Sequence, residues 1–330
     1  MAEMRGIDAA ISELDRARRI AVVAHKGPDG DAIGSSLALA LMLRSLGKEV
    51  RHYARLEDIG APRVMDGLDS LSRPEAAATD PAPDLLVCLD CATVERILVP
   101  YFRDNFAKFR SLVIDHHESN PRYGDVNFVV DDASSTGELV WMIAKRAGWK
   151  MDRMVAEALW VAIVTDTGRF SYGATHPSTL ECGADLLRRG VRHEYLNDQI
   201  FSKEALNTAL LRARAYSTLE TWFDGAVAVI RLDAGDYEEF GCRKADSEEF
   251  VNIPRSVRGV KLAIFFYRSA SEEKCTHLSI RACGGVDACA FASLFGGGGH
   301  RAASGATIDC GVDEAIARVR ATLENFLSTT

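Results

Sequence analysis

The sequence predicts an α/β protein: an N-terminal doubly wound, mostly parallel sheet, joined by a helical linker to a smaller C-terminal α/β domain. From residue 20 to about 190, short apolar runs alternate with longer helical patterns. This alternation is typical of a parallel sheet with helices on both faces. A helical pattern then occupies 201–222, and a second series of apolar runs begins at residue 226. We therefore expect domains at 1–190 and 225–330, with a linker at 191–224.

The N-terminal domain is expected to begin with an amphipathic helix, because four apolar residues between positions 7 and 14 share one helical face. Gly47 and Gly148 each follow a predicted helix, where a left-handed residue commonly ends one. Ser135 and Glu138 form a capping-box pattern at the start of another helix. The expected strands are 20–25, 48–54, 84–90, 111–115 and 126–130, and the expected helices are 32–46, 94–108, 135–147, 151–165 and 177–189.

The linker is expected to be one long helix over 201–222, because Ala205, Leu206, Ala209, Leu210 and Ala213 are spaced for a buried stripe. The C-terminal domain, at about 100 residues, has a size that folds readily alone. Its expected strands are 226–232, 260–268, 276–283 and 305–310, and its expected helices are 286–294 and 312–327.

The composition is that of an ordinary globular protein of 330 residues. No apolar run is long enough to span a bilayer, and the charged N-terminus lacks a secretory signal. The eight cysteines are scattered singly, as expected for reduced, buried thiols in a cytoplasmic protein. Cys88 and Cys91 form a C-x-x-C pair, but no second pair completes a zinc set.

The net charge is −8 at pH 7. A protein that coats long nucleic acid normally carries a basic stripe, whereas this chain would repel a polyanion at long range. The charge therefore favours a short or small phosphorylated substrate over long duplex nucleic acid.

Ligand-type side chains follow four apolar segments of the N-terminal domain. In an open α/β sheet the carboxyl ends of the strands converge on one crevice. The sequence therefore predicts an enzyme with a polynuclear metal site. The candidates are His25, Asp29 and Asp31 after the first strand, Asp90 after the third, Asp115, His116 and His117 after the fourth, and Asp166 after the apolar segment 159–165.

Carboxylates gathered in one crevice would repel each other. At an effective dielectric constant of 20, each close pair costs roughly 3–4 kcal/mol, and two divalent cations would neutralise four such charges. The mixture of carboxylate oxygen and imidazole nitrogen favours an intermediate ion over calcium or structural zinc. Mn²⁺ is the first choice, with Fe²⁺, Co²⁺ and Mg²⁺ as alternatives.

Two further residues beside these ligands are candidates for contact with phosphate. Ser35 lies in the first turn of the helix 32–46, whose N-terminal amides offer an anion site. Arg169 is a candidate phosphate contact, with an ion pair to a nearby carboxylate as the ordinary alternative.

A glycine run at 296–299 precedes His300 and Arg301. Glycine allows close approach of the backbone to a ligand, and the exposed amides of such a loop can cradle an anion. A mobile loop is the ordinary alternative. A Walker A loop is excluded because no G-K-[ST] follows.

At these residues the chain resembles the DHH phosphoesterase superfamily. Four segments are similar to its motifs, and a fifth is similar to the signature of the associated DHHA1 domain. Within the superfamily, the closest resemblance is to the bifunctional oligoribonuclease and pAp phosphatase (nanoRNase) branch. The segments are His25-Lys-Gly-Pro-Asp-Gly-Asp-Ala-Ile-Gly-Ser35, Leu89-Asp90, Asp115-His116-His117, Thr165-Asp166-Thr-Gly-Arg-Phe170, and Phe295-Gly-Gly-Gly-Gly-His300-Arg-Ala-Ala-Ser-Gly305.

The resemblance implies a role for each matching residue. His117 would contact the scissile phosphate, and Asp115 would steady the neighbouring imidazole. Arg281 would contact substrate from its strand, with a solvated edge-strand arginine as the alternative. The implied ligands are His25, Asp29 and Asp90 for one metal, and Asp31, Asp90, His116 and Asp166 for the other. The implied substrate clamp is Gly297, Gly298, Gly299, His300 and Arg301.

The resemblance also implies a reaction. Water activated by two divalent ions would hydrolyse short oligoribonucleotides, the 3′-phosphate of pAp, or both. A phosphodiesterase for linear or cyclic dinucleotides is the first alternative, and a nucleotide-binding regulator without turnover is the second. The expected partners are short RNA, a dinucleotide or pAp as substrate, with no membrane. A homodimer is one assembly that the sequence allows.

Overall fold

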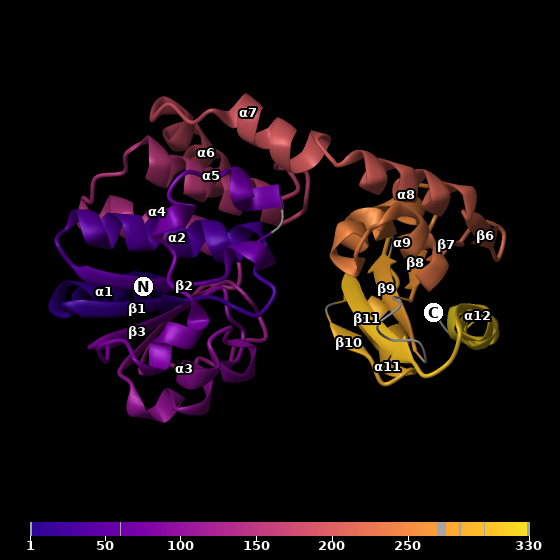
Figure 1. Cartoon of the computed structure of the whole chain (residues 1–330), viewed down its shortest axis with the longest axis horizontal. Helices are drawn as coiled ribbons and strands as arrows, with labels where there is room; N and C mark the ends of the chain where they lie inside the picture. Colours follow the sequence, from indigo (N-terminus) through magenta and orange to yellow (C-terminus); the bar gives the residue numbers. More distant parts are fainter. Residues whose placement is uncertain (1, 60, 269–274, 284, 300, 329–330) are drawn as a thin grey trace. The chain divides into compact units, whose positions relative to one another are not determined.

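The computed structural model describes residues 2–59, 61–268, 275–283, 285–299 and 301–328. The chain forms two compact units, Met1–Lys203 and Glu204–Thr330 (Figure 1). Among the described residues, no helix combines the length and the apolar character needed to cross a membrane.

The first unit is built on a five-stranded, fully parallel sheet with the order β2-β1-β3-β4-β5. Ile20 of β1 is in register with Val50 on one side and with Leu85 on the other. The winding direction therefore changes between β1 and β3, which makes this point the topological switch of the sheet. The strands are β1 (Arg19–Val23), β2 (Glu49–Tyr53), β3 (Leu85–Leu89), β4 (Ser111–Asp115) and β5 (Val126–Val129).

Alternate residues of the central strands enter two separate cores. Ile20 and Val22 belong to the larger core, which the main helices cover, and Ala21 and Val23 belong to the core on the opposite face together with Phe102. Burial on both faces explains why these strands are continuous apolar runs rather than alternating ones.

The helices of the first unit complete the predicted doubly wound arrangement. Figure 1 shows α2, α4 and α5 on one side of the sheet and α3 on the other. The predicted α/β fold class is thereby confirmed. The helices are α1 (Ala2–Arg16), α2 (Gly30–Ser45), α3 (Pro100–Asp104), α4 (Thr136–Ala147), α5 (Arg153–Asp166), α6 (Pro177–Arg188) and α7 (His193–Asn197).

The single helix predicted over 94–108 is wrong. Three short helices replace it, at Val94–Arg96, Pro100–Asp104 and Phe106–Lys108. Pro100 begins the middle helix, and Val99 before it is extended, with ψ of 108°. A residue before proline is driven out of the helical region and the proline has no amide to donate, so a continuous helix cannot pass this point.

The single linker helix predicted over 201–222 is also wrong. A π-helical turn spans Asp198–Ser202, Lys203 is extended, and α8 begins anew at Leu206–Ser217. The stripe predicted to be buried is also wrong. Leu206, which belongs to that stripe, is 77% exposed, and the buried residues of α8 are Leu211 and Ala215. The two halves belong to different cores: Phe201 packs against the core of the first unit and Leu211 lies in a core of the second.

The second unit contains a six-stranded mixed sheet with the order β10-β11-β9-β8-β7-β6. Only β7 and β8 are parallel. One face is packed against α11 and α12, and α8 and α9 contribute to a second core around Phe265. The strands are β6 (Glu220–Trp222), β7 (Val227–Leu232), β8 (Leu262–Tyr267), β9 (Thr276–Ala282), β10 (Gly298–Gly299) and β11 (Ala303–Ile308), and the helices are α9 (Ala234–Phe240), α10 (Asn252–Arg255), α11 (Ala288–Ser293) and α12 (Val312–Ser328).

The sequence analysis missed β6, β10, α9 and α10. For α9 a signal was present, because Asp233 caps the helix, Asp236 accepts from the Asp233 amide, and Gly241 ends it in a left-handed conformation. For β10 no signal was present, because a two-residue glycine strand exists only through its pairing with β11.

Candidate metal centre

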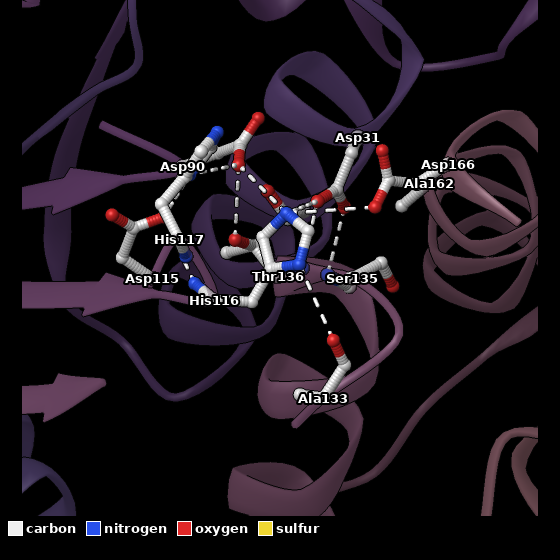
Figure 2. Close-up of polar contacts among 12 residues, drawn as sticks. Asp31, Asp90, Asp115, His116, His117, Ala133, Ser135, Thr136, Ala162 and Asp166 are labelled. Carbon is white, nitrogen blue, oxygen red and sulfur yellow. Dashed lines mark hydrogen bonds and ion pairs between the residues drawn. The ribbon is translucent and has the colours of Figure 1, made fainter. Parts of the chain in front are cut away.

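The expected metal ligands of the first unit converge at the carboxyl ends of β1, β3 and β4. His25 lies two residues beyond β1, Asp90 directly follows β3, and His116 directly follows β4. Because β3 lies between the other two strands, these three side chains meet at the switch point of the sheet. Figure 2 shows the contact between Asp90 and His116. Asp29 and Asp31 join them from the start of α2, where Asp29 is the N-cap residue.

Asp166 reaches the same centre from a helix, which agrees with the helix expected over 151–165. It is the last residue of α5, and its carboxylate lies 3.5 Å from Nε2 of His116 (Figure 2). The C-terminus of a helix carries partial negative charge. Asp166 therefore adds to the negative potential of the centre.

The ligand atoms fall into three overlapping groups with spacings suited to metal binding. Within each group, the candidate atoms lie within 4.8 Å of one another. His25 Nε2 lies 3.8 Å from Asp29 and 3.4 Å from Asp90, and His116 Nε2 lies 3.6 Å from Asp90. The groups are His25, Asp29 and Asp90, and Asp31, His116 and Asp166; Asp90, His116 and His117 form a third set.

Asp90 occupies the middle of the centre in an unusual backbone conformation. Its φ is 51°, and it is one of few described residues other than glycine with a positive φ. Its amide donates to Ile114 of β4 at 3.0 Å, and its Oδ1 accepts from the Thr136 hydroxyl at 3.2 Å. A left-handed aspartate at the tip of a buried strand costs conformational free energy, and such conformations cluster at functional sites.

Asp31 is held by the start of helix α4. Its two oxygens accept from the amides of Thr136 at 2.7 Å and Gly137 at 2.8 Å (Figure 2). These are N-terminal amides that lack partners within their own helix. Even so, complete burial, followed by the charges of Asp90, Asp166 and Asp29, raises the pKa of Asp31 well above its usual value.

Glycines allow helices α2 and α5 to meet closely enough to form the centre. A Cβ on Gly30 would lie 2.3 Å from Oγ1 of Thr165, and one on Gly34 would lie 2.4 Å from the carbonyl oxygen of Ala158. Gly30 separates Asp29 from Asp31, and Thr165 precedes Asp166. The same close contact therefore brings carboxylates of both helices together.

Asp115 holds the His117 ring. Its Oδ1 lies 2.7 Å from Nδ1 of His117 and also accepts from the His116 amide at 2.9 Å. Its Oδ2 accepts from Asn120 at 2.6 Å. Burial acts to raise the pKa of Asp115, but the contacts with His117, Asn120 and His116 outweigh it and hold that pKa below its usual value. Asn120 was missed by the sequence analysis, because a polar residue in a loop carries no pattern.

Glu138 is a buried carboxylate that orders the loop before α4. Its Oε2 accepts from the amide and the hydroxyl of Ser134, and from the Thr179 hydroxyl at 3.0 Å. The capping box predicted for Ser135 and Glu138 is therefore only half formed: Ser135 caps the Glu138 amide, but Glu138 turns to Ser134. The same loop places the Ala133 carbonyl oxygen 3.3 Å from Nδ1 of His116 (Figure 2).

The electrostatics of the centre indicate an excess of negative charge. Burial raises the pKa of Asp166 to about 6; His116 acts to lower it, and Asp90 and Asp29 raise it further. Burial alone would lower the pKa of His25, but its hydrogen bonds to Asp29 and Asp90 outweigh this and raise it to about 10. Protons offset part of the charge. Two divalent cations in the paired donor groups would offset it fully, so the residues present fit two such ions.

The two residues proposed beside the metal ligands have other contacts. Ser35 is fully buried, and its hydroxyl faces the Ala32 carbonyl oxygen of its own helix at 3.4 Å, so its geometry does not support a phosphate contact. Arg169 is exposed and left-handed, with a φ of 59°, and its guanidinium lies 4.9 Å from the ring centre of Phe201. Among the described residues, no carboxylate forms an ion pair with Arg169.

In the second unit, Arg281 and the glycine run lie on strands β9 and β10, which are separated by β11. Arg281 of β9 is in register with Ala303 of β11, and its guanidinium contacts the Ser279 hydroxyl at 3.4 Å and the Ile280 carbonyl oxygen at 3.1 Å. Arg301 is exposed. His300 lies outside the described residues.

The glycines of the run are required by the fold to different degrees. A Cβ on Gly297 would lie 2.2 Å from the Gly305 carbonyl oxygen, and Gly299 has a φ of 142°. Gly298 pairs with Gly305 in the β10–β11 ladder, and a Cβ there would meet nothing within 4 Å. The run is therefore partly an edge strand rather than only a loop, and Gly298, like Gly296, has open space above it.

A doubly wound sheet that gathers carboxylates and imidazoles at its switch point, followed by a small mixed-sheet unit, is the architecture of a metal-dependent phosphoesterase. The chain belongs to the DHH family. Residues 19–163 match the model of the DHH family N-terminal domain, and residues 224–329 match that of the DHHA1 domain.

Two curated relatives share most of their length with this chain. The bifunctional oligoribonuclease and PAP phosphatase NrnA of Thermus thermophilus is 34% identical over 91% of this chain and 87% of its own length. The Bacillus subtilis protein of the same name is 30% identical over 86% and 87%. The cyclic-di-AMP phosphodiesterase PdeA of Listeria monocytogenes is 25% identical over 90% of this chain and 46% of its own length.

A solved structure agrees with the fold. The crystal structure of an exopolyphosphatase-related protein from Bacteroides fragilis matches with a TM-score of 0.90 at 27% identity, covering 98% of this chain and 96% of that one.

Proposed function

We propose that the protein hydrolyses short oligoribonucleotides and the 3′-phosphate of pAp with the help of two divalent cations. The position of Asp90 carries the proposal: its Oδ2 lies 3.4 Å from His25 and its Oδ1 lies 3.6 Å from His116. A carboxylate whose two oxygens face different donor groups is suited to bridge two ions. The names of the NrnA relatives support the substrate class.

The donor chemistry supports Mn²⁺ as the preferred ion. Each donor group combines carboxylate oxygens with one imidazole nitrogen, a mixture that suits Mn²⁺ better than Ca²⁺ or structural Zn²⁺. Mg²⁺, Co²⁺ and Fe²⁺ remain alternatives. When bound, the two cations supply positive charge beside the phosphate and a water of lowered pKa.

His117 is proposed to contact the scissile phosphate. The hydrogen bond to Asp115 assigns a proton to Nδ1 and fixes the ring orientation. Burial acts to lower the pKa of His117, but Asp115 outweighs it and raises that pKa. A protonated His117 can donate from Nε2 to a phosphate oxygen and stabilise the charge that develops there.

The second unit is proposed to bind the remainder of the substrate through Arg281, Arg301, His300 and the glycine run. The open space above Gly298 supports close approach of a ligand to the backbone. The guanidinium of Arg281 supplies positive charge on β9, which is separated from the glycine strand β10 by β11.

The test is hydrolysis of pAp, a short RNA and cyclic di-AMP by the wild type and by Asp90→Asn, with Mn²⁺ or Mg²⁺. Asparagine also tolerates a positive φ, so the variant should fold while losing at least about 10³-fold in kcat/KM, a loss of about 4 kcal/mol of transition-state stabilisation. Asp104→Asn, which alters an exposed carboxylate, is the control. Turnover by Asp90→Asn at the wild-type rate would contradict the bridging role.

The same substrate panel examines the two alternatives. The PdeA relative favours a dinucleotide phosphodiesterase as the second candidate, which would cleave cyclic di-AMP faster than pAp or RNA. A regulator without turnover would bind these nucleotides at saturating Mn²⁺ and release no product.

A further inference from the structure

A pocket of about 470 Å³ opens in the first unit along β1 and the edge strand β2. Its volume lies within the range of small-molecule sites. Its wall includes Arg19 and Glu49, the first residues of the two strands, whereas the metal ligands follow the opposite ends. None of the residues assigned to the metal centre lines it.

The positive charges of two arginines in the pocket, Arg44 and Arg51, are poorly offset by neighbouring carboxylates. Arg44, half-buried, donates only to neutral acceptors: the carbonyl oxygens of Val50 and Ser70 and the Ser70 hydroxyl. Among the described residues, no carboxylate lies within 4.0 Å of its guanidinium. Arg51 lies 3.9 Å from Asp80, whose other oxygen already accepts from the Tyr53 hydroxyl at 2.8 Å.

The other charges of the pocket are already paired. Arg19 forms an ion pair with Asp84 at 3.4 Å, and Glu49 forms one with Arg18 at 3.4 Å. Arg51 shares the charge of Asp80, so among the described residues it is the positive charge of Arg44 that has no carboxylate within 4.0 Å. An arginine cannot lose its proton in a protein, so an anion is the means by which this charge is offset.

The pKa values of Arg44 and of the nearby His52 both reflect this positive charge. Burial, followed by the charge of Arg51, lowers the pKa of Arg44. Burial and the charge of Arg44 lower the pKa of the fully buried His52 to about 3. His52 therefore stays neutral and contributes no further charge at the pocket.

The remaining wall is apolar and suits a flat, uncharged group. Pro81 and Pro83 line it together with Ile20 and Val50. Ser72 adds a hydroxyl near the arginines. The pocket thus combines two guanidinium groups, which favour phosphate, with an apolar surface.

We propose that this pocket is a second, non-catalytic site for a small organic phosphomonoester, with the phosphate between Arg44 and Arg51 and the organic group against Pro81 and Pro83. The site is separate from the metal centre and does not depend on the reaction catalysed there.

The test uses the full-length, Mn²⁺-loaded protein and adenosine monophosphate as the probe in isothermal titration calorimetry, fitted to two sites because this nucleotide is also the product expected from pAp at the metal centre. Arg51→Ala should weaken its binding at least tenfold, and Arg51→Glu more, with unchanged hydrolysis at the metal centre. Arg16→Ala is the matched control, because Arg16 is an exposed arginine paired with Glu13 and neither residue lines the pocket. Thermal unfolding verifies that each variant is folded.

Two further measurements complete the test. One distinguishes this pocket from the metal centre, and the other compares the nucleotide with inorganic phosphate as the ligand. Asp90→Asn should retain the adenosine monophosphate binding that Arg51→Ala weakens, and inorganic phosphate should bind at least tenfold more weakly than the nucleotide. Unchanged binding in both Arg51 variants, or loss of binding in Asp90→Asn, would overturn the proposed site. Equal affinity for inorganic phosphate would overturn the role of the apolar wall.

Discussion

The carboxylate of Asp31 accepts the backbone amide of Gly137 at 2.8 Å, although 106 residues separate the two in sequence. This contact joins the first turn of α2 to the first turn of α4. A Cβ on Gly137 would lie 2.5 Å from Cβ of Ala162 in α5, so α4 and α5 also meet at this point. The metal centre is therefore a junction of three helix ends placed above one edge of a sheet.

Gly30→Ala should weaken Mn²⁺ binding and destabilise the first unit by about 1–3 kcal/mol, because the new Cβ would overlap Thr165 in α5. The measurements are metal affinity by calorimetry and the free energy of unfolding. The double variant Gly30→Ala/Thr165→Ala should recover part of both losses, since it removes Oγ1 and Cγ2 of Thr165.

Gly235→Ala is the matched control for Gly30→Ala. Gly235 lies within helix α9, and a Cβ there would meet nothing within 4 Å. It should leave metal affinity unchanged and stabilise the protein slightly, as alanine does in helices. Wild-type Mn²⁺ affinity in Gly30→Ala would show that the α2–α5 contact does not set the centre.

Glu138→Ala should destabilise the protein by about 1–3 kcal/mol, because the buried amide of Ser134 and hydroxyl of Thr179 lose their acceptor. The loop that supports His116 through the Ala133 carbonyl oxygen should loosen, and Mn²⁺ affinity should fall. Glu138→Gln should be close to wild type, since one oxygen accepts all three hydrogen bonds. Equal losses in both variants would instead assign the role to the charge of Glu138.

Asp115→Asn should lower kcat while Mn²⁺ affinity stays near the wild-type value. The hydrogen bond and charge of Asp115 raise the pKa of His117 against the opposing effect of burial, so the variant should lower that pKa. If protonated His117 stabilises the phosphate, activity is lost as pH rises through its pKa. The basic limb of the pH–rate profile should then move to lower pH, and an unmoved limb would remove His117 from this role.

Without metal, Asp166 should make the folded protein less stable as pH rises from about 4 to 6. Burial raises its folded-state pKa to about 6 from an unfolded value of 3.8, so in this window the folded state holds a proton that the unfolded state has released. Stability is then lost as pH rises. In EDTA, Tm of the wild type should fall more between pH 4.5 and 7 than Tm of Asp166→Asn, by a few degrees.

Mn²⁺ should reverse this pH dependence. The cation competes with the proton on Asp166, so its affinity rises with pH and the stabilisation it provides grows over the same range. Identical Tm–pH curves for the wild type and Asp166→Asn in EDTA would contradict the raised pKa.

Much of the first unit could be predicted from the sequence because its signals are local. Strands such as β3 and β4 are continuous apolar runs, and Gly148 ends α4 in a left-handed conformation, as its position indicated. The single helices predicted over 94–108 and 201–222 are wrong for two different reasons. Pro100 interrupts the first, and the second is divided between the cores of two units. Apolar periodicity indicates that a helix has a buried face, but not which of two cores that face enters.

The sequence by itself determined the ligand types and the strand ends that carry them, since Asp90 and Asp115-His116-His117 directly follow or end apolar runs. Only the tertiary structure decided that Asp166 lies 3.5 Å from His116, that Thr136 and Gly137 hold Asp90 and Asp31, and that Glu138 turns to Ser134. These contacts depend on how closely three helices pack, which the glycines at positions 30, 34 and 137 permit. No local pattern encodes that distance, because it is a property of pairs of segments far apart in the chain.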